Sequence, residues 1–319
     1  MILSFIKTPL TGDAWEEWCD ACYRIRYQSD NYQKIPATYR GDAGIEGYTQ
    51  KGIVYQCYCP EREYNDDELY EHQRDKLTKD INKLVDQTYK QRLKDLGVPT
   101  IKQWHYVVPF YKDNRLLQHA TAKRNEILRG KSGKPKEYDH LDDNFVIVIK
   151  VAEDFKVEFS KIIRETITDT KLNVVVKSFD TIPWDKCPSE KVHNIQRKIK
   201  AVMNPVNDDD EDFKDVVGAY VAYYIKGIEI LRMLQADFPE IYEHIYTLER
   251  ACKNEVSLKT KMNQDRSLNM SIFNEILGEF EQKLSREFDK YFTTSSIMEL
   301  KHDMVGAWLA DCPMEFRRG

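Results

Sequence analysis

GDAGIEGYTQKGIVYQCYCPE, residues 41–61, predicts a β-hairpin. The IVY sequence at residues 53–55 favours a β-strand, because β-branched and aromatic side chains pack well on a pleated surface. The TQKG sequence at residues 49–52 supplies a tight turn before that strand. Two short strands around one turn are therefore expected at this point of the chain.

Acidic and amide side chains stand on both strands of this hairpin. Asp42 and Glu46 lie at the start of the first strand, and alternation places Gln56 and Tyr58 on the same face of the second. Adjacent strands lie about 4.8 Å apart, so the Glu46 carboxylate and the Gln56 amide are placed to share a divalent cation. Asp42 is either a second acid of this site or a turn residue that caps the backbone.

The elements around the hairpin are predicted from apolar periodicity. Residues 13–28 carry aromatic and Cys side chains at helical spacing, with Asp13 as the expected N-cap. A long charged helix is predicted over residues 66–96. The elements expected after it are strand 104–110, helix 114–128, strand 144–151, helix 153–168 and strand 172–179. The first half of the chain is therefore predicted to be an α/β domain.

The hairpin resembles a known family motif. RGDAGIEGY followed by VYQCY is similar to the central motif of Mrr-type restriction endonucleases in the PD-(D/E)xK nuclease superfamily, where a G-D-x-G-I-D-G segment precedes a strand carrying Q-x-K. The order of helix, hairpin, helix, strand, helix and strand also matches the core of that superfamily. The resemblance covers residues 13 to about 151, and its specific motif covers residues 41–58. It implies a restriction-endonuclease-like domain, with a small mixed sheet flanked by helices.

The resemblance also implies roles for individual residues. Glu46 stands where the family carries its metal-binding aspartate, and Gln56 where it carries glutamate or glutamine. Asp42 is a further acid at this motif, and Glu17 or its neighbour Glu16 corresponds to the carboxylate that many members carry in the first helix. The implied cofactor is Mg²⁺ or Mn²⁺, held by Glu46 and Gln56, and the implied partner is double-stranded DNA.

Tyr58 departs from the family pattern, because it stands where the family has its lysine. In the family that lysine is thought to orient the attacking water and to steady charge on the phosphate, which requires a cation. A phenol with a pKa of about 10 is neutral at pH 7 and can only hydrogen-bond. Either Lys51 on the turn or Lys76 on the next helix takes over this task, or the site is degenerate and the domain only binds.

The second half of the chain is predicted to be all-helical. NPVNDDDEDF, residues 204–213, carries five consecutive acids and marks the junction, where a solvated linker is favoured over a site for a metal or a basic partner. Helices are expected at 213–235, 237–256, 265–292 and 295–311. The predicted divisions are a restriction-endonuclease-like domain at 1–183, an acidic linker at 184–212 and a helical partner-binding domain at 213–319.

The wider pattern is similar to nuclease-like components of prokaryotic antiviral conflict systems, including three-component systems built around an ABC-type ATPase. The similarity rests on a Q-x-Y-x-P strand, the long helix after it and a W-H-Y-V-V-P strand. In such families a nuclease-like region is joined to a helical region that contacts partner proteins. The resemblance therefore implies an ATPase or sensor protein as a partner. Homo-oligomerisation stays open at this stage.

A basic segment, KRNEILRGKSGKPK at residues 123–136, is the candidate for contact with a phosphate backbone. The alternative is a solvated loop without a ligand, because phosphate contacts require presentation on the same side as the hairpin. His105 lies within an apolar strand and is expected to be a hydrogen-bonded core residue. The candidate phosphate-binding residues are Lys123, Arg124, Arg129, Lys131, Lys134 and Lys136.

Composition narrows the function classes. The chain has 319 residues and a net charge of -5, so contact with DNA would need a local basic patch. No signal peptide or membrane-spanning run is recognised, and seven irregularly spaced cysteines fit reduced thiols, which predicts a cytoplasmic protein. The pairs Cys19/Cys22 and Cys57/Cys59 are either zinc ligands or, as we favour, small buried side chains.

Three hypotheses of different classes follow. A metal-dependent DNA endonuclease would cut DNA in a reaction that needs Glu46. A pseudo-nuclease adaptor would not cut, and would bind an ATPase or sensor through its helical half. A metabolic enzyme would need a further pocket motif, and the sequence shows no phosphate-binding glycine loop, nucleophile elbow or histidine-rich metal cluster.

Overall fold

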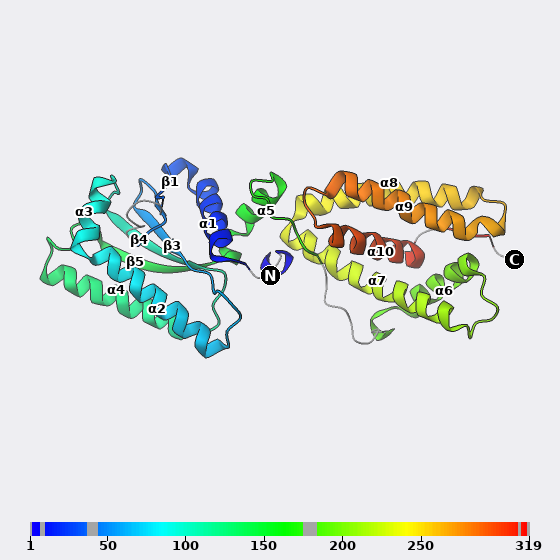
Figure 1. Ribbon diagram of the computed structural model, residues 1–319, viewed down its shortest axis with the longest axis horizontal. Coiled ribbons are helices and arrows are strands. Elements are labelled where there is room, and N and C mark those ends of the chain that lie inside the picture. Colours follow the sequence, from blue (N-terminus) through cyan, green and yellow to red (C-terminus); the bar gives the residue numbers. More distant parts are fainter. Residues whose placement is uncertain (1, 7–9, 37–43, 175–183, 312–313, 318–319) are drawn as a thin grey trace. The chain divides into compact units, whose positions relative to one another are not determined.

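The computed structural model describes residues 2–6, 10–36, 44–174, 184–311 and 314–317. The chain divides into two compact units, Met1–Thr168 and Asp169–Gly319 (Figure 1). The first holds a mixed sheet with flanking helices, and the second is helical. The expected fold class, an α/β domain followed by an all-helical region, is confirmed.

The sheet has five strands in the order β1-β2-β3-β4-β5. The first three pair in antiparallel fashion and include the predicted hairpin, whose turn lies at residues 49–52. The last three are parallel, so helices must connect them. The strands are β1 (Gln33–Lys34), β2 (Gly47–Tyr48), β3 (Ile53–Cys57), β4 (Ile101–Val108) and β5 (Leu141–Val151).

One face of the sheet is covered by α1 (Gly12–Arg26), which also contacts α5 (Lys156–Arg164). Tyr23 of α1 stacks on Tyr55 of β3, with ring centroids 3.9 Å apart. The N-cap of α1 is Thr11, whose hydroxyl accepts a hydrogen bond from the Ala14 N–H at 3.2 Å, so the prediction of Asp13 as cap was wrong by two positions. Two short 3-10 helices, Gln28–Asp30 and Ala152–Phe155, lie at the ends of α1 and β5, and a third spans Ile2–Phe5.

The opposite face is covered by α2 (Asp66–Val85) and α4 (Arg115–Gly133), which contact each other (Figure 1). Their apolar side chains share one core with alternate residues of β3 and β4, including Val54 and Trp104. The predicted helix 66–96 is broken at Asp86, because that carboxylate accepts a hydrogen bond from the Thr88 N–H at 2.8 Å and caps a separate helix, α3 (Gln87–Asp95).

The second unit is built around α10 (Thr294–Asp311), which contacts three other helices, α6, α7 and α9. The four predicted helices are present as α7 (Glu211–Asp237), α8 (Pro239–Met262), α9 (Asn269–Phe288) and α10, with a short 3-10 helix at Arg266–Leu268. Tight packing of α7 on α10 requires Gly306, because a Cβ at that position would lie 2.9 Å from the Tyr224 nitrogen.

The range predicted as a linker contains a packed helix. Helix α6 (Ser189–Met203) follows a 3-10 turn at Trp184–Lys186 and contacts α7, α9 and α10. The acidic run begins α7, since Asp210 caps its first turn by accepting a hydrogen bond from the Phe213 N–H at 3.1 Å. Acids at a helix N-terminus are favoured by the helix dipole. The boundary between the two units lies between residues 168 and 169, earlier than the predicted linker.

The last predicted strand, residues 172–179, falls partly outside the described residues. Its described start belongs to the helical unit, where Leu172 forms a parallel β-bridge with Phe292. Within the described residues it adds nothing to the five-stranded sheet.

Candidate functional site

The side chains of Glu46 and Gln56 meet across the hairpin. Gln56 lies in β3, and Glu46 stands directly before β2, where its N–H donates to the Tyr55 carbonyl at 2.7 Å. The Gln56 Nε2 donates a hydrogen bond to the Glu46 Oε1. Both residues are buried: 6% of the surface of Glu46 and 1% of the surface of Gln56 is exposed. The proximity expected from the hairpin pattern is therefore observed.

The amide oxygen of Gln56 is buried and has no hydrogen-bond partner. An unpaired buried acceptor costs about 1–3 kcal/mol, so a water molecule or a cation is favoured beside it. Carboxylate and amide oxygens are the ligands that Mg²⁺ and Mn²⁺ accept, and the Glu46–Gln56 pair therefore fits such an ion chemically. In the described ranges no three His, Cys, Asp or Glu side chains gather as a metal site, so water or substrate oxygens would complete the coordination.

Glu16, and not Glu17, is tied to the first strand of the sheet by a lysine. The Lys34 Nζ on β1 forms an ion pair with the Glu16 carboxylate at 3.1 Å, whereas Glu17 is exposed. Burial alone would lower the pKa of Lys34, but Glu16 and more distant acids, Glu46 among them, raise it above its usual value. Sequence reasoning did not single out Lys34, because only the pairing of β1 with β2 brings it to the hairpin.

Tyr58 continues the line of β3 beyond its last residue. Its N–H donates to the Val107 carbonyl at 2.9 Å, and its ring packs against the core under α2 and α4. Burial, followed by the nearby Tyr64 and Glu61, raises the pKa of Tyr58 to about 12. The phenol is therefore neutral at physiological pH and supplies no positive charge.

The two lysines expected to replace the missing cation are already paired. The Lys51 Nζ lies 2.6 Å from the Asp30 carboxylate at the turn of the hairpin. The Lys76 Nζ lies 2.9 Å from Asp80, a wholly buried residue that also meets Lys83 at 3.3 Å. Each lysine is thus held by a carboxylate other than that of Glu46.

Asp42 lies outside the described residues. The chain that leads from it to Glu46 is anchored at Gly44, whose carbonyl accepts a hydrogen bond from the Trp104 indole at 3.3 Å. Gly44 has a φ of 79°, and a Cβ there would lie 2.8 Å from the Asp80 carbonyl of α2. Only glycine fits this approach, so the G-I-E segment is fixed against α2.

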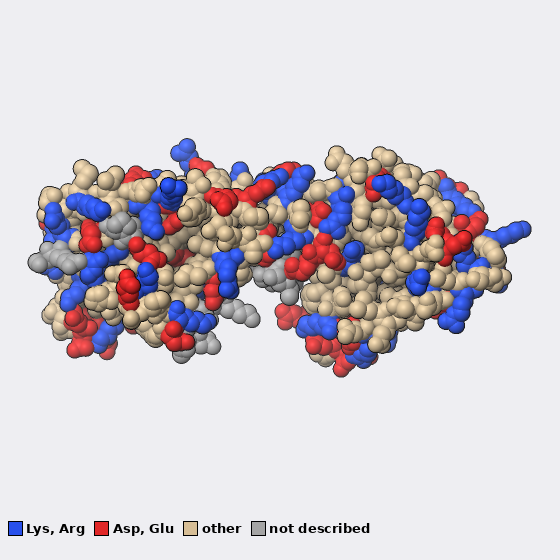
Figure 2. Space-filling model, turned by 180° about the vertical axis from the view of Figure 1, so that it is seen from behind, with Lys and Arg blue, Asp and Glu red and all other residues tan. Residues whose placement is uncertain are grey.

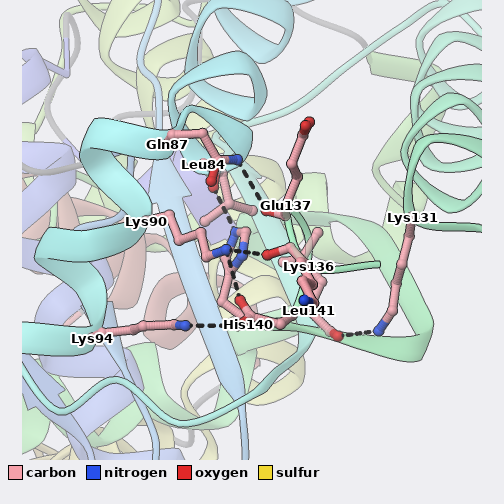
Figure 3. Close-up of polar contacts among 10 residues, drawn as sticks. Leu84, Gln87, Lys90, Lys94, Lys131, Lys136, Glu137, His140 and Leu141 are labelled. Atoms are coloured by element: carbon pink, nitrogen blue, oxygen red, sulfur yellow. Dashed lines mark hydrogen bonds and ion pairs between the residues drawn. The ribbon is translucent and has the colours of Figure 1, made fainter. Parts of the chain in front are cut away.

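The predicted basic loop is mostly helix, because α4 continues to Gly133. Two of its six cations bind backbone carbonyls of β5: the Arg124 Nε donates to Phe145 at 3.1 Å, and the Lys131 Nζ donates to Leu141. Figure 3 shows Lys131 reaching Leu141, and the Lys90 side chain reaching the Lys136 carbonyl.

Three further cations of this segment also have local contacts. Lys123 pairs with Glu126 at 2.9 Å, and Lys134 pairs with Glu137 at 3.1 Å. The Arg129 Nε donates to the Asn125 carbonyl at 3.3 Å. On the face that Figure 2 shows, Lys and Arg side chains are interspersed with Asp and Glu. Binding of DNA by this segment stays a prediction.

His105 is a hydrogen-bonded core residue, as expected. Its Nδ1 lies 2.7 Å from the Tyr23 hydroxyl, and its Nε2 lies 2.9 Å from the Gln103 Oε1. Burial, with a smaller effect of Lys150, lowers the pKa of His105 to about 3. The imidazole is therefore neutral and structural.

The four cysteines considered as zinc ligands are buried: Cys19, Cys22, Cys57 and Cys59. Burial raises the pKa of the first two thiols well above its usual value, so both are protonated and behave as small hydrophobic groups.

None of the described helices combines the length and apolarity needed to cross a bilayer. Comparisons with protein-family models, with curated proteins and with solved structures find no match for this chain.

Proposed function

We propose that this chain is a nuclease-like component of a prokaryotic antiviral defence system, and that its N-terminal unit is a catalytically degenerate restriction-endonuclease-like domain. The proposal rests on Tyr58. This residue stands at the position of the family's lysine, and its pKa of about 12 keeps it neutral. The domain then binds without cutting.

Hydrolysis of a phosphodiester needs positive charge at the phosphate and an activated water. Glu46 and Gln56 would hold the divalent ion, which on binding lowers the pKa of water and polarises the phosphate. A neutral phenol at Tyr58 donates one hydrogen bond at most. The charge that develops on the phosphate is thus left without its second cation, since Lys51 and Lys76 pair with Asp30 and Asp80.

The helical unit is proposed to carry the partner, an ATPase or a sensor protein. The support is the resemblance of the strand and helix pattern at residues 56–109 to such components, together with the separate apolar core of the described helices around α10. An ATPase gene beside the gene for this chain would be the first evidence to seek.

An active, atypical endonuclease is the second candidate, and Lys34 favours it. This lysine pairs with Glu16 at 3.1 Å, and acids that include Glu46 raise its pKa, so it remains cationic. In this alternative, Lys34 supplies the charge that Tyr58 lacks.

Incubation of the full-length protein with supercoiled plasmid and Mn²⁺ separates the two candidates. We expect no cutting by the wild type, and nicking gained by Tyr58→Lys but not by Tyr58→Phe. Adding Glu46→Ala to the lysine variant should abolish that nicking. Cutting by the wild type that Lys34→Ala and Glu46→Ala both abolish would establish the active alternative. A Tyr58→Lys variant that binds Mn²⁺ without nicking would contradict the placement of Tyr58 at the lysine position.

A further inference from the structure

Strand β5 is the last strand of the sheet, so one of its edges has no neighbouring strand among the described residues (Figure 1). The strand is long, running from Leu141 to Val151, and most of its residues are partly exposed. Long apolar edge strands invite pairing with another chain, and proteins blunt them with charged side chains.

Both ends of this edge are capped by charged side chains. The Phe145 carbonyl points away from β4 and accepts a hydrogen bond from the Arg124 Nε at 3.1 Å. The Val151 N–H points the same way and donates to the Asp154 Oδ2 at 2.9 Å. The cap at Phe145 is therefore a cation, and the cap at Val151 is an anion.

Between the two caps the edge is open. Backbone groups alternate along a strand, so Ile147 and Ile149 share the orientation of Phe145 and Val151 and direct their N–H and C=O groups outward. No other described residue forms a hydrogen bond with these outward groups. The open window is therefore centred on Val148.

We infer that this window is the dimer interface of the chain, formed by antiparallel pairing of β5 with β5 of a second copy. A two-fold axis at Val148 places Ile147 opposite Ile149 of the partner subunit, and each such pair exchanges both of its N–H···O bonds. All the open edge groups are then satisfied, and the two sheets become one.

The caps favour a second copy over an unrelated strand. Antiparallel pairing about Val148 brings Phe145 opposite Val151 of the partner subunit, and hence Arg124 beside Asp154 of the partner subunit. The two caps, which are opposite in charge, meet at both ends of the window, whereas a parallel arrangement would bring caps of like charge together. The inference does not depend on whether the hairpin site cuts DNA.

Disulfide trapping tests the register. Val148 would face Val148 of the partner subunit in a pair without mutual hydrogen bonds, with Cα atoms about 4.5 Å apart, a separation that a disulfide spans. We expect Val148→Cys to form a covalent dimer on oxidation by copper phenanthroline. Val146→Cys is the matched control, because it lies on the same face but would face Lys150 of the partner subunit. The wild type is the control for cross-linking through native cysteines. The six cysteines among the described residues are all buried.

Charge reversal provides a second test, read by sedimentation velocity over about a hundredfold range of micromolar concentrations. We expect Arg124→Glu and Asp154→Arg each to weaken the dimer about tenfold, and the two together in one chain to restore it. A purely local capping role would make the two losses add. A chain that stays monomeric, equal cross-linking at positions 146 and 148, or additive losses would overturn the inference. Circular dichroism of each variant checks that it is folded.

Discussion

The Nε2 of Gln56 donates to the Oε1 of Glu46, while the Oε1 of the same amide has no hydrogen-bond partner. Within the described residues, the Gln56 amide thus has a partner for its N–H group but none for its oxygen. The amide oxygen of Gln56, beside the Glu46 carboxylate, is in position to bind a cation or a water molecule.

Replacing this amide with a second carboxylate should destabilise the protein in a way that a metal relieves. Gln56→Glu places two buried carboxylates together at neutral pH, which we expect to lower the free energy of unfolding by about 1–3 kcal/mol. Added Mn²⁺ should recover the loss, as measured by urea denaturation with and without the ion. The swapped variant, Glu46→Gln with Gln56→Glu, keeps one carboxylate and one amide and should stay near wild-type stability. An unchanged stability of Gln56→Glu without metal would contradict the close contact.

Gly52 sets the position of the hairpin against β4. It has a φ of 86°, and a Cβ there would lie 2.4 Å from the Thr100 carbonyl. We expect Gly52→Ala to cost about 3 kcal/mol of unfolding free energy, from backbone strain together with this clash. Gly97→Ala is the control, since Gly97 has a φ of 74° but no atom within 4 Å of its Cβ position, and it should cost only about 1–2 kcal/mol. Equal losses in chemical denaturation would show that the Thr100 contact is unimportant.

Because His105 is buried in its neutral form, we expect the protein to lose some stability in acid. Its pKa is about 3 in the folded protein, lowered first by burial, whereas an unfolded chain titrates its histidines near about 6.5. The unfolded state binds the extra proton between these values, so the contribution of His105 to stability is complete above about pH 6.5 and falls by up to about 1.4 kcal/mol per unit as the pH drops toward 3. Urea midpoints across this range should fall less steeply for His105→Gln than for the wild type. Replacement of the exposed His72 by glutamine should leave the wild-type slope unchanged.

For Asp303, in the helical unit, we expect the opposite dependence of stability on pH. Its carboxyl oxygens are buried in α10 without hydrogen-bond partners, close to Gly227 of α7. Burial, with a further contribution from Glu299 that Lys226 opposes, raises the pKa of Asp303 to about 8. The folded state binds the extra proton between about pH 4 and 8, so stability falls as the pH rises through this range, by up to about 1.4 kcal/mol per unit.

The isosteric Asp303→Asn variant should remove most of this dependence and exceed the wild type in stability at pH 8. Thermal or urea denaturation at pH 5, 6.5 and 8 would measure both effects. Glu299→Gln, at a partly exposed neighbour, should change the slope far less. A wild type and an Asp303→Asn variant with the same dependence on pH would mean that Asp303 has a charged partner in solution.

The sequence by itself determined the kinds of elements and their order. Alternation in the hairpin, apolar spacing in the helices and the breaks between them depend on neighbouring residues, so these local signals predicted an α/β half and a helical half. The pairing of Glu46 with Gln56 was also accessible, because a tight turn sets which residues of a hairpin face each other.

Only the tertiary structure decided which charges have partners. Asp86 breaks the long helix, Arg124 and Lys131 cap the carbonyls of β5, and Lys34 lies beside Glu16 through a strand that the sequence pattern did not reveal. These outcomes depend on groups far apart in the chain, whose approach balances burial, hydrogen bonding and charge over the whole unit. Local patterning has no access to that balance, and for the same reason the state of Tyr58 followed from its packing under α2 and α4.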